Sequence, residues 1–297
     1  MTFHDFLHIL GHTGLEVLSL LPFLFLTYLV MEWMEHKMGD GTRHVIERAG
    51  RFGPALGGAL GMVPQCGFSS AAAGLYAGRV VSLGTLFAVF LSTSDEMLAI
   101  AISHLPQGTV EVWDIIKMVA VKAVMGMAWG FLIDLLLPQK RACHEKEHDH
   151  IGEMCDHHHC GCEKGIFRSA VKHALEVSLF IFLVSFALDV VVHLIGEETL
   201  ATFLASGGIF TSLISPLVGL IPNCAASVII TELYLSGALS VGALYGGLLT
   251  GAGVGILVLF RTNRPLKENL LIAAGLYGIG ALTGVLIDLL GLTWLGL

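Results

Sequence analysis

The residues best suited to chemistry stand in a motif that the sequence contains twice. Gly61-Met62-Val63-Pro64-Gln65-Cys66 and Gly219-Leu220-Ile221-Pro222-Asn223-Cys224 share the pattern Gly-x-x-Pro-amide-Cys, and their cysteines lie 158 residues apart in a chain of 297. A pair of thiolates selects soft or borderline ions over Mg²⁺ or Ca²⁺, and the amides add oxygen ligands and hydrogen-bond donors. The repeated motif therefore predicts a site for a soft or borderline ion.

Each motif is expected to break a helix, because a proline removes one backbone donor and clashes with the preceding turn. We predict two hairpins of half-helices, over about residues 52–78 and 203–237, whose broken ends offer free carbonyl and N–H groups to a ligand. The alternative is that prolines and small cysteines only let helices pack closely. Packing alone does not explain why an amide and a thiol recur together. The expected substrate-binding residues are Pro64, Gln65, Cys66, Ser69, Pro222, Asn223, Cys224 and Ser227.

The composition indicates an integral membrane protein. Hydrophobic residues make up 55 %, charged residues 13 %, and the mean hydropathy is +0.78, whereas soluble domains contain about 25 % charged residues. The net charge of −8 argues against a nucleic-acid partner. Six apolar segments are long enough to cross a lipid bilayer: residues 15–34, 80–104, 113–137, 172–194, 239–260 and 268–290.

Basic residues predict the orientation of these segments. Lys and Arg cluster in residues 36–51, at 140–141 and in residues 261–267, which places these loops in the cytoplasm and both termini outside a bacterial cytoplasmic (inner) membrane. The first 14 residues contain no Lys or Arg, so the first span is expected to stay in the mature protein.

The expected fold is an all-α integral membrane protein of two inverted repeats, residues 1–137 and 171–297, joined by a loop at 138–170. Each repeat would have three full spans and one re-entrant hairpin, ten helical pieces in all, and this odd number of crossings turns the halves upside down to each other. Two further echoes support the duplication: Leu15-Glu16-Val17 with Leu175-Glu176-Val177, and residues 130–136 with 284–290. Hairpins that cross fully would make the halves parallel, which the basic loops disfavour.

Carboxylates inside apolar spans are costly and indicate function by default. Candidate coupling residues are Asp95, Glu96, Glu232 and Lys122. Lys117 and Lys122 in the neighbouring span leave open whether the carboxylates carry coupled protons or cations, or form structural ion pairs. Asp134 and Asp288, near span ends, are expected to be solvated caps.

The central loop concentrates thiols and imidazoles, which suit Zn²⁺, Ni²⁺ or copper ions. Their spacing is not that of a zinc finger, so we expect a flexible buffer or sensor, with a solvated linker as the alternative. No other cofactor is expected. The candidate metal ligands are Cys143, His144, His148, His150, Cys155, His157, His158, His159, Cys160 and Cys162. His4, His8 and His12 share one helical face, either as the polar edge of an interfacial helix or as a metal-collecting stripe.

The paired Pro-Gln-Cys and Pro-Asn-Cys motifs, the inverted halves and the His-rich loop resemble the ten-transmembrane heavy-metal exporters, which are related to the arsenic permeases of bacteria. The resemblance implies secondary-active export of a heavy-metal or metalloid ion, with arsenicals and manganese both proposed, and no enzyme activity. It places Pro64, Gln65, Cys66 and their counterparts at the substrate.

Two alternatives remain: a transporter of Mn²⁺ or another divalent cation bound by Asp95 and Glu96, and a membrane-embedded thiol redox enzyme. The chain has no Walker motif for ATP, so protons are the expected coupling ion. The ion, the direction of transport and the oligomeric state stay open.

Overall fold

Helices account for the secondary structure of the described residues. The computed structural model describes residues 3–37, 52–63, 65–93, 95–107, 110–137, 166–196, 199, 201–202, 204 and 210–296, and no strand occurs among them. The first half contains α1 (Phe3–Lys37), α3 (Gly53–Gly61), α4 (Cys66–Ala77), α5 (Leu83–Ser92), α6 (Asp95–Ser103), η1 (Leu105–Gln107) and α7 (Val112–Leu136). The second contains α9 (Ile166–Ile195), α11 (Thr211–Gly219), α12 (Cys224–Leu235), α13 (Val241–Thr250), α14 (Gly255–Thr262), α15 (Leu266–Leu289) and η4 (Thr293–Leu295).

Six helical segments are long and apolar enough to cross a membrane, by length and composition. They overlap all six segments expected from the sequence, so the prediction of an all-helical, multi-pass membrane protein is confirmed at this level. The six are Ile9–Val30, Leu83–Ser103, Val112–Leu136, Ser169–Leu194, Val241–Thr262 and Leu266–Leu289.

The two halves repeat the same elements. Helices α3, α4 and α5 recur as α11, α12 and α13, and each of their boundaries is shifted by 158 residues. The turns at the motifs also repeat, because the N–H of Gln65 donates to the Val63 carbonyl at 2.8 Å and that of Asn223 donates to the Ile221 carbonyl at 2.7 Å. The sequence repeat therefore corresponds to a repeat of backbone structure.

In each half a tight turn at the motif joins two short helices, α3 with α4 and α11 with α12, and we call each such pair a hairpin. Gly53 lies against Thr85, and Gly61 lies against Ser92, so α3 and α5 run in the same direction. The intervening helix α4 must therefore lead the chain back to the level at which α3 began. The same order holds in the second half, where Gly219 at the end of α11 lies against Thr250 at the end of α13.

One of the three candidate spans in each half contains an interruption of its helix, a feature that the sequence did not predict. Helix α5 ends at Ser92 and α6 begins at Asp95, while Gly251–Val254 separate α13 from α14. The hydroxyls of Ser92 and Thr93 donate to carbonyls of the last turn of α5, which competes with continuation of the helix. In the second half Gly253 adopts a φ of +53°, a conformation that glycine reaches without strain.

The halves interlock through these broken pieces. Helix α4 packs on α14, and α12 packs on α6, so the second helix of each hairpin contacts the broken span of the other half. Arg79, after α4, donates to both carboxylate oxygens of Glu268 in α15 at 2.7 and 2.9 Å.

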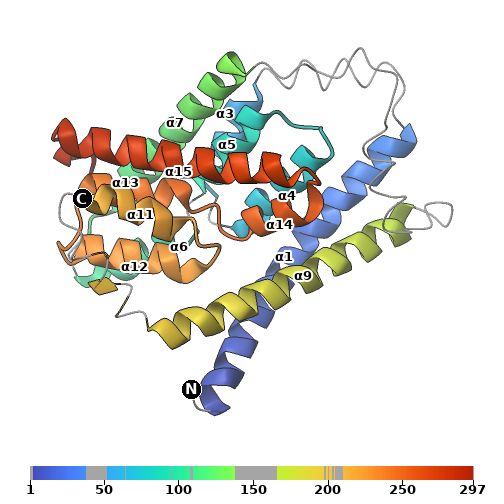
Figure 1. Cartoon of the computed structure of the whole chain (residues 1–297), viewed down its shortest axis with the longest axis horizontal. Helices are drawn as coiled ribbons and strands as arrows, with labels where there is room; N and C mark the ends of the chain where they lie inside the picture. The colour runs from blue at the N-terminus through green and yellow to red at the C-terminus, as the bar shows by residue number, and fades with distance from the viewer. Residues whose placement is uncertain are drawn as a thin grey trace.

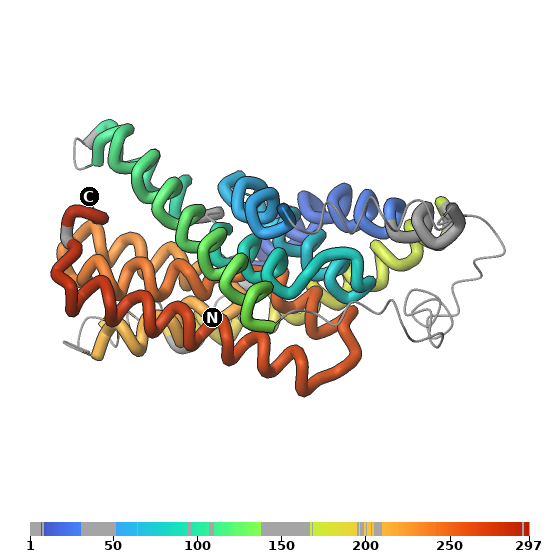
Figure 2. The backbone as a smooth tube through the Cα atoms, turned by 90° about the horizontal axis from the view of Figure 1, so that it is seen from above, coloured from blue at the N-terminus to red at the C-terminus, as the bar shows by residue number. Residues whose placement is uncertain are grey.

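Helices α1 and α9 pack against each other and cross on one side of the molecule (Figure 1). In Figure 2, α7 (green) and α15 (red) are the long continuous helices beside the shorter broken pieces.

Two aspartates at equivalent positions of the two halves each bind the start of a neighbouring helix. Asp134 accepts hydrogen bonds from the Ser82 hydroxyl at 2.6 Å and the Gly84 N–H at 2.8 Å, both at the start of α5. Asp288 accepts equivalent bonds from Ser240 at 2.8 Å and Gly242 at 2.9 Å at the start of α13. These aspartates therefore cap the start of a neighbouring helix, where free N–H groups need acceptors. Asp288 is exposed and Asp134 is half-buried, in agreement with the expectation of solvated caps.

The close approach of α13 and α15 predicts the effect of adding one methyl group. A Cβ atom at Gly242 would collide with the backbone carbonyl oxygen of Gly284 and with the side-chain carboxylate of Asp288. We expect Gly242→Ala to lower stability by about 1–3 kcal/mol, the usual cost of overpacking. Gly278→Ala is the matched control, because a Cβ atom there meets nothing within 4 Å. Thermal unfolding in detergent measures both, and equal melting temperatures would contradict the packing described here.

Candidate metal centre

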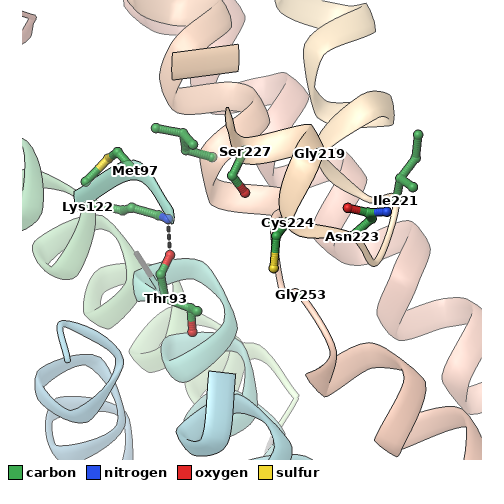
Figure 3. A pocket seen from close by; sticks show the side chains of 11 residues that line it. Thr93, Met97, Lys122, Gly219, Ile221, Asn223, Cys224, Ser227 and Gly253 are labelled. Carbon is green, nitrogen blue, oxygen red and sulfur yellow. Dashed lines mark hydrogen bonds between the residues drawn. The ribbon is translucent and has the colours of Figure 1, made fainter. Parts of the chain in front are cut away.

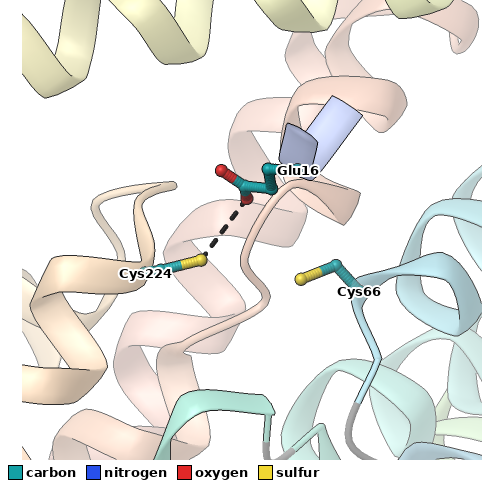
Figure 4. Close-up of side chains that lie close together, drawn as sticks. All are labelled: Glu16, Cys66 and Cys224. Carbon is teal, nitrogen blue, oxygen red and sulfur yellow. Dashed lines mark hydrogen bonds between the residues drawn. The ribbon is translucent and has the colours of Figure 1, made fainter. Parts of the chain in front are cut away.

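Three side chains from three helices meet at one point. The Glu16 carboxylate of α1 and the thiols of Cys66 and Cys224 place their ligand atoms all within 4.8 Å of one another. Figure 4 shows the three side chains pointing toward a shared centre, and the Cys224 thiol donates to Glu16 Oε1 over 3.4 Å. The structure therefore brings together the two cysteines singled out in the sequence and adds a carboxylate.

The broken hairpins position both cysteines. Cys66 is the first residue of α4 and Cys224 the first of α12, after Gln65 and Asn223 in extended conformation with φ of −160° and −146°. A helix start carries free N–H groups and the positive end of the helix dipole, which favour an anionic group such as a thiolate. Both sulfur ligands thus lie where the backbone stabilises negative charge.

Close packing brings α1 to the hairpin tips, which are the turns at Gln65–Cys66 and Asn223–Cys224. The ring of Phe23 fills the space that a Cβ atom on Gly67 would need, so only glycine after Cys66 lets α1 approach so closely. Phe23 also contacts Phe68 edge to face, with ring centroids 5.5 Å apart. Because Phe23 lies two turns after Glu16 on the same helix, this contact fixes the level of the carboxylate.

A second carboxylate, that of Asp189, contacts the second tip without joining the group of three ligand atoms. Asp189 of α9 accepts a hydrogen bond from the Asn223 amide at 2.6 Å and another from the Thr13 hydroxyl at 2.5 Å. The Asn223 side-chain oxygen in turn accepts from the Ala225 N–H at 2.7 Å and caps α12. Asp189 therefore links α1, α9 and the residue before Cys224.

Sequence reasoning missed both Glu16 and Asp189 as site residues. Each is a carboxylate inside an apolar span, which is the signal that singled out Asp95 and Glu96. Glu16 was noted only as part of a repeated tripeptide, because nothing in the linear sequence shows that α1 passes the hairpin tips.

Two cavities reach this centre: the larger is lined by all three of Glu16, Cys66 and Cys224, and the smaller by Glu16 and Cys224. One of about 590 Å³ is lined by Gln65 and Cys66, and another of about 400 Å³ is lined by Asp189, His193 and Asn223. Both also touch His12, Glu16 and Cys224. An ion of a few ångströms could therefore approach the ligands through either cavity.

A small cavity beside the second tip contains the buried Lys122 (Figure 3). Its volume is about 20 Å³, enough for one water molecule. Lys122 is only 2 % exposed and donates to the carbonyl of Thr93, where α5 ends. A cation is stabilised by the free carbonyls at a helix C-terminus. The corresponding residue of α15 is the buried Leu276, so only the first half carries this charge.

Three other expected site residues lie in or near the hairpins, and a fourth lies away from the centre. Ser69 is buried and donates to the Cys66 carbonyl at 2.8 Å, so it supports the first turn of α4. Ser227 lines the small cavity, and Pro222 lies in the second tip. Glu232 is 49 % exposed and lies 3.7 Å from His104, so the structure does not bring it to the centre.

Several predictions from the sequence fall outside what the structure describes. These are Pro64, the side chains of Asp95, Glu96, His4 and His8, and all the candidate ligands of the loop between Cys143 and Cys162.

The comparison with known families bears on the second half. Residues 142–256 match the family model described as "Putative, 10TM heavy-metal exporter". The match includes the second hairpin with Asn223 and Cys224, and it confirms the resemblance for this stretch of the chain. No curated protein and no solved structure shows significant similarity to the chain.

The contacts of Asp189 predict the mobility of the second tip. Asp189→Ala leaves the amide of Asn223 without this acceptor, and an unsatisfied polar group costs about 1–3 kcal/mol. We expect amide hydrogen exchange across residues 220–228 to accelerate by about tenfold or more, since 1.4 kcal/mol corresponds to a factor of 10. The control is Leu183→Ala on the same helix, where the side chain is 57 % exposed. Equal exchange in both variants would show that Asp189 does not hold the tip.

Proposed function

We propose that this chain is a secondary-active transporter that exports a heavy-metal or metalloid ion across a bacterial cytoplasmic membrane. The observation that carries the proposal is the convergence of Cys66 and Cys224 with Glu16 at the tips of two equivalent hairpins. The family match over residues 142–256 and the six apolar helices support a metal-exporting membrane protein. The ion would bind between the tips and leave through one of the cavities that reach them.

In the proposed mechanism the two halves lie upside down to each other and rock about the ion. Helices α4 and α12 each pack on the broken span of the opposite half, so a movement of one half changes the surroundings of both cysteines. The Arg79–Glu268 ion pair joins the halves away from the tips and would have to rearrange in such a movement.

Protons are the proposed coupling ion, with Asp95 and Glu96 at the start of α6 as their carriers. Lys122, whose ammonium group lies at the end of α5, would balance charge at the same break. The His- and Cys-rich loop is proposed to collect ions on the cytoplasmic side.

Cys66 and Cys224 do not form a disulfide in this structure. Their grouping with a carboxylate favours ion binding over a thiol redox reaction, in which Glu16 would have no evident part.

Transport measurements test the role of the tips. We expect Cys66→Ser and Cys224→Ser each to reduce Cd²⁺ or arsenite transport into inverted membrane vesicles by at least about tenfold, since losing even a supporting residue of a metal site costs about 10–100-fold. Cys160→Ser, which removes a loop thiol, should retain transport. Undiminished transport by both tip variants, together with transport of Mn²⁺, would favour the divalent-cation alternative that uses Asp95 and Glu96.

Labelling from one side of the membrane tests the inverted arrangement. Val80 and Ala238 occupy equivalent positions after α4 and α12, 158 residues apart. With serine at the four loop cysteines, Val80→Cys should react with a membrane-impermeant maleimide only from the cytoplasm and Ala238→Cys only from outside. Reaction of both from the same side would mean that the halves are parallel.

A further inference from the structure

We infer that Glu16 is a direct ligand of the transported ion, which makes the site two sulfurs and one oxygen and selects a borderline divalent ion of the Zn²⁺ and Cd²⁺ class. This inference rests on the proposed function and goes beyond it by adding a ligand from α1 and by naming the class of ion.

The depth of Glu16 is the first argument. The residue lies within the candidate span Ile9–Val30, where a carboxylate is costly and retained for a function. Its carboxylate approaches the Cys224 thiol to 3.4 Å and lines both larger cavities. The carboxylate is thus placed at the cysteines and remains reachable for an ion.

The distances fit tetrahedral coordination. Zn²⁺ binds thiolate sulfur at about 2.3 Å and carboxylate oxygen at about 2.1 Å, which separates the two ligand atoms by about 3.6 Å. The Cys224 Sγ to Glu16 Oε1 distance is 3.4 Å, and all three ligand atoms lie within 4.8 Å of one another. Small side-chain movements would therefore complete three corners of a tetrahedron.

An incomplete ligand set suits an ion that must leave again. Structural zinc sites have four protein ligands, whereas sites with three keep a position open for water or another group. Among the described residues, the group contains three such ligands. An ion bound here would keep one exchangeable position.

Charge and softness decide the class of ion. Two thiolates and one carboxylate carry three negative charges, of which a divalent cation compensates two. As(III) hydroxide binds two thiols by releasing two waters and forms a neutral product, which leaves the carboxylate charge uncompensated. Hard ions such as Mn²⁺ and Mg²⁺ prefer sites made of oxygen ligands, and two sulfurs of three ligands disfavour them. The carboxylate therefore shifts the preference toward borderline divalent ions.

The repeat supplies a matched control. Glu176 stands in the repeated Leu-Glu-Val tripeptide at the place that corresponds to Glu16, but its carboxylate lies 3.8 Å from Lys172 and is not among the three ligands at the tips. Removing the charge of either glutamate is the same chemical change in the two halves, and only one change alters the site.

Cadmium titration of the purified full-length chain tests the inference. Serine replaces the four loop cysteines, so the ultraviolet charge-transfer absorption of cadmium–thiolate bonds reports on Cys66 and Cys224 and not on loop histidines. We expect Glu16→Gln to weaken Cd²⁺ binding by at least about tenfold, Glu16→Asp to weaken it less, and Glu176→Gln to leave it unchanged. The same glutamine variant should change As(III) binding by less than about twofold, a difference that lies below the free energy of one hydrogen bond.

The outcomes separate this inference from the proposed function. If Cys66→Ser and Cys224→Ser abolish the absorption while Glu16→Gln and Glu16→Asp bind Cd²⁺ like the parent, Glu16 is not a ligand and the cysteine site stands. If Glu16→Gln weakens As(III) as much as Cd²⁺, the divalent class is wrong. If neither serine variant alters the absorption, both the ligand and the proposed function fail. Melting curves of each variant show whether a loss of binding reflects unfolding, in which case Glu16→Asp decides.

Discussion

Interrupted backbone inside an apolar bundle is the constraint on which this structure depends. Where a helix stops within a membrane, its last carbonyls and the N–H groups of the next helix have no water to bond, so other protein groups must satisfy or cover them. Here the coverage is mutual. Lys122 donates to the Thr93 carbonyl at the end of α5, Asn223 accepts from the Ala225 N–H at the start of α12, and α4 and α12 each lie on the broken span of the opposite half. The polar centre forms at the hairpin tips because the interruptions of the hairpins and of the two broken spans lie close together in the fold.

The two repeated hairpins contribute to this centre in one way, and helices α1 and α9 contribute in another. The hairpins repeat with a constant offset and supply one cysteine each, whereas α1 and α9 supply Glu16 and Asp189, which differ in residue type and in role. Glu16 contacts a thiol, and Asp189 holds the amide of the preceding residue. The two cysteines thus occupy equivalent positions, whereas the two carboxylates do not. The ligand set of the centre therefore depends on α1 and α9 as well as on the repeated hairpins.

The sequence predicted those features that local chemistry determines. Proline and glycine around Cys66 and Cys224 marked both breaks, and the hydropathy of the chain marked six spans that the structure contains as apolar helices. Thr93 and Gly251–Val254 were read as parts of continuous spans, because short polar or glycine-rich stretches also occur inside unbroken helices. Glu16 and Asp189 could not be assigned to the tips, since their place follows from how α1 and α9 cross and from the contact of Phe23 with Gly67. Hydropathy fixes where a helix runs through the bilayer but not which neighbour it meets.

The buried Lys122 has a consequence for the energetics of the two halves. A duplication with identical side chains would give both broken spans the same electrostatic environment, and the two arrangements related by exchanging the halves would have the same free energy. Lys122 of α7 and Leu276 at the corresponding place of α15 remove that equivalence, because one break meets a buried amine and the other an apolar side chain. The two broken spans share a backbone plan but not this side chain, and this chain therefore has an intrinsic polarity that its repeated helices alone would lack.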